Sequence, residues 1–131
     1  MPLTFDVDHD AGVVFTRADG PVSEQDLRQH VTRLAATQGR PPLELADFSD
    51  QVHITVPPGA VREAAWTLSD TDAPQPNSRL ALVGRSDAVY AVLRMFQAHR
   101  ESEGLEVEVF RERDAALAWL TGDDRWLGDV G

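Results

Sequence analysis

The stretch RLALVGRSDAVYAVLRMFQAHRESEGLEVEVFRERDAALAWL, residues 79–120, decides the fold of this chain. Its apolar residues form a short run, then recur at helical spacing, then alternate with period two, and then recur at helical spacing again. Ser86 and Asp87 are residues typical of a helix start, and they precede the first segment with helical spacing. Asp114 is typical of the start of the second such segment, and Gly122 is typical of its end. The stretch therefore predicts a strand, helix, strand and helix. Parallel strands need such crossovers, which indicates an α/β sheet.

The first half of the chain contains three more predicted strands and two more predicted helices. The segments LTFDVD (3–8) and GVVFTRA (12–18) alternate and are close in sequence, which predicts a hairpin. Ser23 to Asp26 has the pattern of a capping box, and an apolar stripe follows it. Further along lie LELADF (43–48), a predicted strand, and a proline-led helix start at 55–58.

The complete order of elements is β-β-α-β-α-β-α-β-α, which predicts a five-stranded mixed sheet with four helices. The first strand is expected to be antiparallel, because it belongs to the hairpin. A length of 131 residues corresponds to one domain. We expect a single domain over residues 1–121 and an acidic, flexible C-terminal tail over residues 122–131.

The composition argues against several classes of partner. The net charge is -10 at pH 7, so phosphate backbones and anionic lipids are repelled, and nucleic acid is not an expected partner. Cysteine is absent, which removes disulfides and thiolate chemistry. No window is long and apolar enough for a membrane-spanning helix, and the first residues do not resemble a secretion signal. The sequence predicts a cytoplasmic protein without membrane insertion.

Four segments resemble the SpoIIAA-like branch of the STAS domain superfamily. They are ADGPVSEQD (18–26), LELADFSD (43–50), AVYAVLRMF (88–96) and VFRERDAALAWL (109–120), and the resemblance extends over about residues 3–121. It implies a small bacterial domain, often oligomeric, that binds protein partners or is proposed to hold apolar ligands. Enzyme activity is not established for most members, and the resemblance concerns function only by analogy of fold.

One motif of the related anti-sigma-factor antagonists is missing from this sequence. Those proteins carry Asp-Ser-Ser/Thr-Gly at the start of the helix after the third strand, where a kinase phosphorylates a hydroxyl group. The matching segment here is Thr55-Val56-Pro57-Pro58-Gly59, which puts Val56 or Pro57 at the phosphorylated position. We therefore expect no phosphorylation switch, and we interpret Thr55 and Ser49 as structural residues.

The sequence offers no convincing catalytic, cofactor or metal site. Asp6, Asp8 and Asp10, with His9 nearby, could ligate a hard cation, but a solvated face of an edge strand is the favoured interpretation. Ser49 lacks the strained G-x-S-x-G turn of a hydrolase. The other histidines lie in separate predicted elements and make no paired metal-binding motif: His30, His53 and His99. We expect no enzyme activity, no cofactor and no metal.

The predicted helix over residues 88–99 has more apolar surface than one neighbouring element can cover. Its core stripe is Val89, Val92, Leu93 and Phe96, and adjoining faces add Tyr90, Ala91 and Met95. Trp66 lies about 140° around the preceding helix from Val61, away from the core stripe of that helix. Helical periodicity does not separate a core role from an interface role for such residues.

This excess of apolar surface leads to two hypotheses. The first is a non-catalytic domain for protein binding or regulation that also forms a homodimer, through a surface made by Trp66, Tyr90, Met95 and Phe96. The alternative is a carrier or sensor that binds a small apolar ligand in a cleft between helices.

Overall fold

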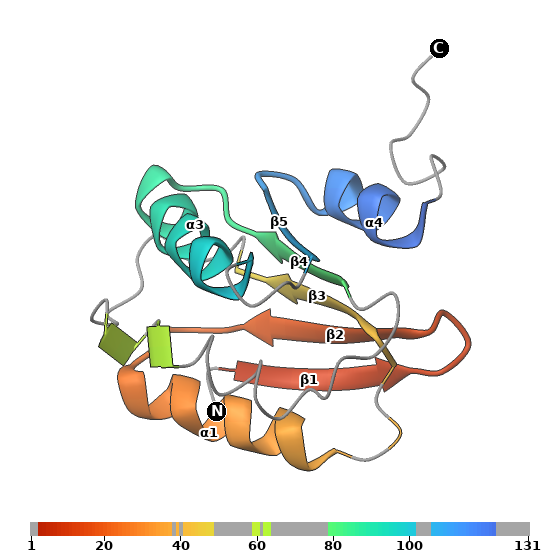
Figure 1. The fold of residues 1–131 in the computed structure, drawn as a ribbon, viewed down its shortest axis with the longest axis horizontal. Coiled ribbons are helices and arrows are strands. Elements are labelled where there is room, and N and C mark those ends of the chain that lie inside the picture. The colour runs from red at the N-terminus through yellow and green to blue at the C-terminus, as the bar shows by residue number, and fades with distance from the viewer. Residues whose placement is uncertain are drawn as a thin grey trace.

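The computed structural model of the chain describes residues 3–37, 39, 41–48, 59–60, 62–63, 79–101 and 106–122. The strands are β1 (Leu3–Asp8), β2 (Val13–Ala18), β3 (Leu43–Asp47), β4 (Arg79–Val83) and β5 (Glu106–Phe110). The helices with given bounds are α1 (Glu24–Ala36), α3 (Asp87–Glu101) and α4 (Arg113–Thr121). Figure 1 shows these elements along the chain.

The strands form one sheet in the order β1-β2-β3-β4-β5. β1 pairs antiparallel with β2, with Leu3 opposite Ala18, which confirms the predicted hairpin. The remaining neighbours, β2 with β3, β3 with β4 and β4 with β5, pair in parallel. The predicted five-stranded mixed sheet is therefore correct.

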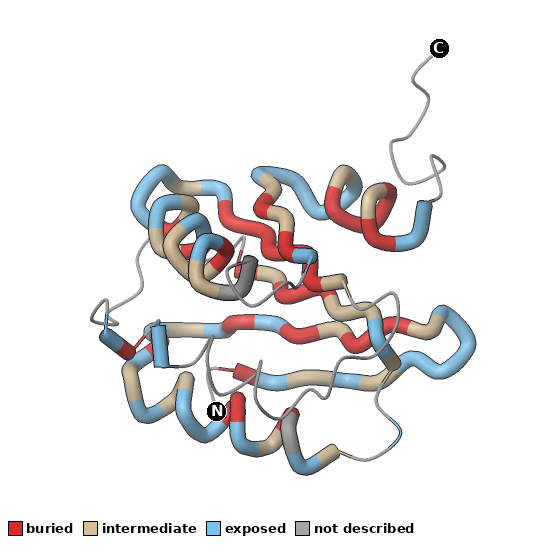
Figure 2. Tube along the Cα trace, viewed as in Figure 1, coloured by how far each residue is buried: buried red, intermediate tan, exposed pale blue. Residues whose placement is uncertain are grey.

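Helices cover both faces of the sheet, and Figure 1 shows α3 and α4 on opposite sides of it. On one face, α1 and α3 pack over a core that includes Leu3, Ala46, Leu80 and Leu93. On the other face, α4 packs against β3, β4 and β5 around Leu45, Ala81 and Leu117. Figure 2 shows buried residues along the central strands and on the inward sides of the helices. Two separate cores result, one on each face.

The start of each helix illustrates how local sequence sets the element boundaries. At α1, Ser23 Oγ accepts from the Asp26 backbone N–H over 3.2 Å, and Asp26 Oδ2 accepts from the Ser23 N–H over 2.9 Å. This is the predicted capping box, and these hydrogen bonds lower the pKa of Asp26. At α3, Ser86 Oγ accepts from the Val89 N–H over 3.2 Å.

The start of α4 differs from the prediction. Asp114 was expected to cap this helix, but the capping residue is Glu112, whose side chain makes no capping hydrogen bond. Asp114 lies in the first turn, where its carboxylate favours the positive end of the helix. The end at Gly122 is as predicted, with a left-handed backbone at φ 71° and its N–H bonded to the Ala118 carbonyl.

The structure describes three of the four predicted helices in full. The fourth, predicted to begin at 55–58, falls mostly outside the described residues, although residues 59, 60, 62 and 63 are helical. No helix in the described ranges has both the length and the apolar character needed to cross a membrane.

Candidate ligand cavity

A cavity of about 70 Å³ lies on the face of the sheet that α1 and α3 cover. Its described lining comes from both helices, from β2, β3 and β4, and from the connections next to β2 and β3. The cavity exists because α1 packs over β1 whereas α3 packs over β4 and β5, so the two helices leave a space above the middle of the sheet.

The walls of the cavity are apolar. From α1 it is lined by Leu27, Val31 and Leu34, and from α3 by Val92, Leu93 and Phe96. Leu34 and Leu93 are almost fully buried. Phe96 is half-buried and packs against Val31, so this side chain of α3 contacts α1. The helical stripes that were predicted as core faces are therefore in the core, and they also line a space within it.

The floor of the cavity is the sheet, and it contains two polar side chains. Thr16 on β2 is 2% exposed, and its hydroxyl donates to Glu44 Oε2 on β3 over 3.0 Å. The remaining floor and edge residues are apolar: Val22, Ala46, Phe48, Leu80 and Leu82. Thr16 and Glu44 are thus a hydrogen-bonded polar pair within an apolar surface.

A third polar group comes from α1. His30 lines the cavity and is 5% exposed, and its Nδ1 makes no hydrogen bond to any residue that the structure describes. Burial, followed by the charge of Arg33, lowers the pKa of His30 to about 4. The imidazole is therefore neutral at pH 7. A neutral ring carries one N–H and one lone pair, so Nδ1 holds an unused donor or acceptor.

His30 lies on the same side of the cavity as the Thr16–Glu44 pair. The His30 ring meets the Phe5 ring edge-on, with centroids 5.8 Å apart. Phe5 is the register partner of Thr16 in the β1–β2 hairpin. Residues that are opposite in an antiparallel pair are close neighbours on one face of the sheet. Thr16, Glu44 and His30 thus belong to the described lining, but their polar atoms are largely covered, and almost all of the surface that the cavity presents is apolar.

The structure describes three of the four residues that were predicted as an interaction surface, all of them on α3. Trp66 lies outside the described residues. Tyr90 is half-buried, packs against the core on the α3 face, and has the Arg111 guanidinium carbon 4.0 Å from its ring centroid. Met95 is half-buried. Phe96 lines the cavity and contributes to the α1–α3 contact. Two of the four residues thus have partners within the domain.

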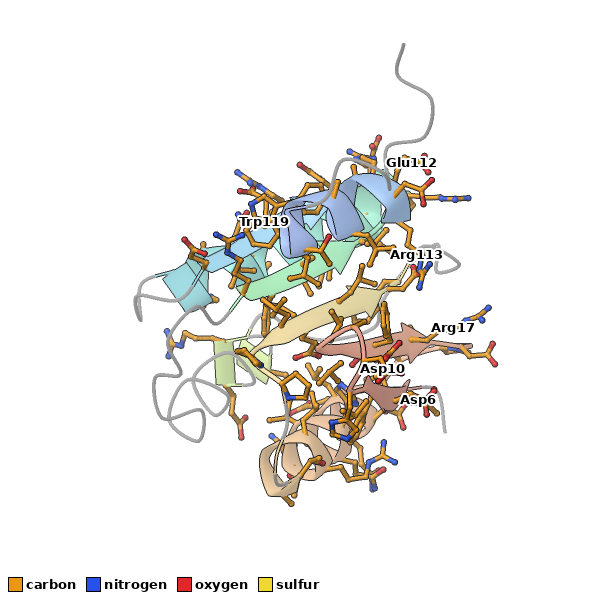
Figure 3. The ribbon with its side chains drawn as sticks, turned by 90° about the vertical axis from the view of Figure 1, so that its right-hand side faces the viewer. Asp6, Asp10, Arg17, Glu112, Arg113 and Trp119 are labelled. Atoms are coloured by element: carbon orange, nitrogen blue, oxygen red, sulfur yellow. The ribbon has the colours of Figure 1, made fainter. Side chains whose placement is uncertain are left out.

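The acidic residues of the hairpin lie away from the cavity. Since Phe5 faces α1, alternation puts Asp6 and Asp8 on the opposite face of β1. Asp8 Oδ1 accepts from the Ala11 N–H over 3.0 Å, as in a turn. Figure 3 labels Asp6 and Asp10 together with Arg17 at the end of β2. In the described part of the chain, no three His, Cys, Asp or Glu side chains come together as a possible metal site.

Several further residues lie away from the cavity. Arg113, labelled in Figure 3, lies 3.7 Å from Asp47, and its guanidinium is 5.5 Å from the Phe15 ring centroid. Trp119, also labelled there, is a residue of α4 that packs against the core on that face of the sheet. Ser49, His53 and Thr55 are outside the described residues, so their expected structural roles stay predictions.

The presence of Thr16, Glu44 and His30 among the lining residues was not predicted. His30 was considered only as a metal ligand, and Thr16 and Glu44 were not considered at all. A signal was present in the sequence, because His30 lies three residues after Leu27 and four before Leu34, on the apolar stripe of α1. Thr16 similarly occupies an inward position between Val14 and Ala18. Polar residues at core positions indicate either buried hydrogen bonds or a site.

Comparison with known proteins agrees with the architecture. A protein of the DUF3478 family from Shewanella loihica PV-4, uncharacterized and with a SpoIIAA-like fold, has a crystal structure that matches with a TM-score of 0.56 and 18% identity. The match covers 90% of this chain and 91% of that one, and at this identity it shows the fold alone. No curated protein matches the sequence. The sequence profile named SpoIIAA-like matches residues 13–121, and the chain therefore belongs to the SpoIIAA-like family.

Proposed function

We propose that this domain binds a small, mainly apolar molecule in the cavity between α1 and α3. The observation that carries the proposal is the cavity itself, whose walls are Leu, Val and Phe side chains from two helices. Ligand sites in proteins are typically concave and apolar, with a few polar groups that orient the ligand. A space lined in this way gains free energy when an apolar group displaces water or fills a void.

The size of the cavity limits the ligand. An engineered cavity of about 150 Å³ holds one benzene molecule. The volume of about 70 Å³ is roughly half of that, so the cavity as it stands admits a small apolar group or one end of a longer molecule. A whole benzene ring or a bulkier ligand needs the cavity to widen, for instance by movement of Phe96, which lines it and packs against Val31 of α1.

Binding fits the polar residues of the cavity better than catalysis does. The Thr16 hydroxyl donates to Glu44 and joins two strands, which is a structural use of the group. His30, with its pKa lowered to about 4, is a weak base at neutral pH. These residues suit a binding role, which also agrees with membership of a family whose fold is shared by non-catalytic domains.

Native mass spectrometry of the purified protein tests the proposal, with two alanine variants as a matched pair. Ala46→Met fills the cavity from β3, where Ala46 is buried, whereas Ala91→Met makes the same change on an exposed position of α3. We expect a small molecule retained in native spectra and released on denaturation, by the unmodified protein and by Ala91→Met but not by Ala46→Met. Equal retention by both variants would show that the molecule binds elsewhere.

Purified protein without a retained molecule is then titrated with benzene. Saturable binding by the unmodified protein, lost in Ala46→Met and kept in Ala91→Met, is the expected result. If neither a retained molecule nor saturable benzene binding is found, the proposed function is wrong.

A further inference from the structure

We infer that the cavity binds the unbranched end of an alkyl chain and leaves the head group of the ligand in water. This inference rests on the proposed function and specifies the chemistry and shape of the ligand. It depends on three observations: the surface of the cavity is almost wholly apolar, its volume is about 70 Å³, and it is partly open to solvent.

The polar side chains of the lining offer no hydrogen bond to a head group. The Thr16 hydroxyl already donates to Glu44 Oε2, and Nδ1 of His30 is covered although the ring lines the cavity. A hydroxyl, ammonium or carboxylate group brought inside would exchange its hydrogen bonds to water for contacts with apolar side chains, which is unfavourable. The part of the ligand that enters the cavity is therefore hydrocarbon.

The volume of the cavity limits the width of that hydrocarbon part. Since an engineered cavity of about 150 Å³ holds one benzene molecule, with its six carbon atoms, a volume of about 70 Å³ corresponds to roughly three carbon atoms. A ring or a branched chain end needs more room, and overfilling a packed core is unfavourable. An unbranched chain fits, because its last few carbon atoms lie inside while the rest of the chain continues outward.

The two helices show the path along which the chain leaves the cavity. Leu34 and Leu93 are almost fully buried and belong to its interior. The half-buried apolar lining residues are Leu27 on α1 and Val92 and Phe96 on α3, so the apolar lining continues to the surface between the helices. The net charge of -10 opposes approach to an anionic bilayer, which favours a free single-chain molecule over a membrane lipid.

Two alcohols of the same formula test the width of the site, because 1-hexanol has an unbranched end and 3,3-dimethyl-1-butanol has a branched one. Each is titrated into ¹³C-methyl-labelled protein and followed by NMR, with Ala46→Met as the cavity-filling variant and Ala91→Met as its exposed control. In the unmodified protein and in Ala91→Met, 1-hexanol should bind at least about fivefold more tightly than its isomer. In Ala46→Met it should bind at least about tenfold more weakly, because each methylene group kept out of the cavity costs about fourfold in affinity.

Hexanoate and hexylammonium test the position of the head group, because they carry the same chain as 1-hexanol. Their affinities should lie within about fivefold of that of 1-hexanol at about 0.15 M salt, which screens charges that stay in water. Intermolecular NOEs give the orientation of 1-hexanol without any variant. Its terminal methyl group should contact Leu34 and Leu93, and the methylene group beside the hydroxyl should contact Leu27 and Val92.

The outcomes separate this inference from the proposed function. The inference alone is overturned if the branched isomer binds as tightly as 1-hexanol, if either charged compound differs from 1-hexanol by more than about fivefold, or if the orientation in the NOEs is reversed. Benzene binding without 1-hexanol binding has the same consequence. Co-sedimentation of the protein with vesicles of phosphatidylcholine and phosphatidylglycerol would overturn the assignment to a free molecule. If neither these compounds nor benzene binds at millimolar concentration, the inference and the proposed function are both wrong.

Discussion

The hydroxyl of Thr16 donates a hydrogen bond to Oε2 of Glu44 over 3.0 Å and so joins β2 to β3 on the floor of the cavity. Thr16 is 2% exposed, and its position on β2 alternates with residues that face α4. The Thr16 hydroxyl gives the Glu44 carboxyl group a hydrogen-bond donor on a surface that is otherwise apolar, where an acceptor without a donor would be destabilising.

Replacing Thr16 tests the importance of this pair. Thr16→Val keeps the shape of the side chain but removes the donor, so Glu44 loses one hydrogen bond in a partly buried site. We expect the free energy of unfolding to fall by about 1 to 3 kcal/mol in chemical denaturation. Thr32→Val, which changes an exposed residue of α1, is the control and should differ from the unmodified protein by less than about 0.5 kcal/mol. Equal effects of the two variants would contradict a special role for Thr16.

The low pKa of His30 predicts a pH-dependent stability. Its ordinary value of 6.5 applies to the unfolded chain, whereas burial and then Arg33 lower it to about 4 in the fold. The unfolded state thus binds a proton more readily, so stability is complete above pH 6.5 and decreases as pH falls toward 4. The loss from this residue amounts to roughly 3 kcal/mol.

Denaturation curves across this pH range measure the effect. His30→Phe lacks the titrating ring, so its unfolding free energy should fall less steeply with decreasing pH than that of the unmodified protein. His9→Phe is the control and should keep the steep dependence, because His9 is exposed. Parallel curves for the unmodified protein and His30→Phe would show that His30 is not buried as described.

The close packing around Gly84, next to the cavity, leaves no room for a larger residue. A Cβ atom at this buried glycine would lie 2.8 Å from Leu93 Cδ1 and 2.9 Å from Val89 Cγ1. Gly84→Ala should therefore destabilise the protein by about 1 to 3 kcal/mol. It should also weaken benzene binding, because Leu93 lines the cavity and is pushed toward it.

Gly59→Ala is the matched control for that variant. A Cβ atom there meets no heavy atom of the described residues within 4 Å, and Gly59 is in helical conformation. Since alanine favours helices over glycine by up to about 1 kcal/mol, this variant should be neutral or stabilising. A Gly84→Ala protein as stable as Gly59→Ala would contradict the close packing around Gly84.

Self-association remains a prediction of the apolar surface on α3. Met95 is half-buried, which leaves part of its side chain for a partner subunit, whereas Trp66 lies outside the described residues. Sedimentation of the unmodified protein should show a dimer, and the double variant Trp66→Ala with Met95→Glu should give a folded monomer. A monomer of 14.4 kDa for the unmodified protein at high micromolar concentration would refute this prediction.

Much of the fold was predictable because local signals and periodicity agree with the tertiary structure. The hairpin, the capping box at Ser23 and the left-handed end at Gly122 follow from short-range chemistry. The error at α4 has a physical reason as well. The negative charge of Asp114 is favourable anywhere in the first turn of α4, so it does not define the first residue of the helix. The helix begins after Glu112 because β5 ends at Phe110.

The cavity could not be predicted in the same way. Periodicity identifies the residues of α1 and α3 that face the sheet, but it does not tell whether they touch each other or leave a space. Phe96 has the spacing of a core residue, yet its neighbours include both Val31 and the cavity. The side-by-side positions of Thr16 and Glu44 depend on strand pairing across 28 positions of sequence. Only the tertiary arrangement brings His30 to the same surface.

Intermolecular NOEs between bound benzene and the methyl groups of the protein test the central claim most directly. The account predicts NOEs from the benzene protons to Val31 and Leu34 on α1 and to Leu93 on α3, and their loss in Ala46→Met. NOEs confined to methyl groups on the α4 face, such as those of Leu117, or an NOE pattern unchanged in Ala46→Met, would contradict a binding site between α1 and α3.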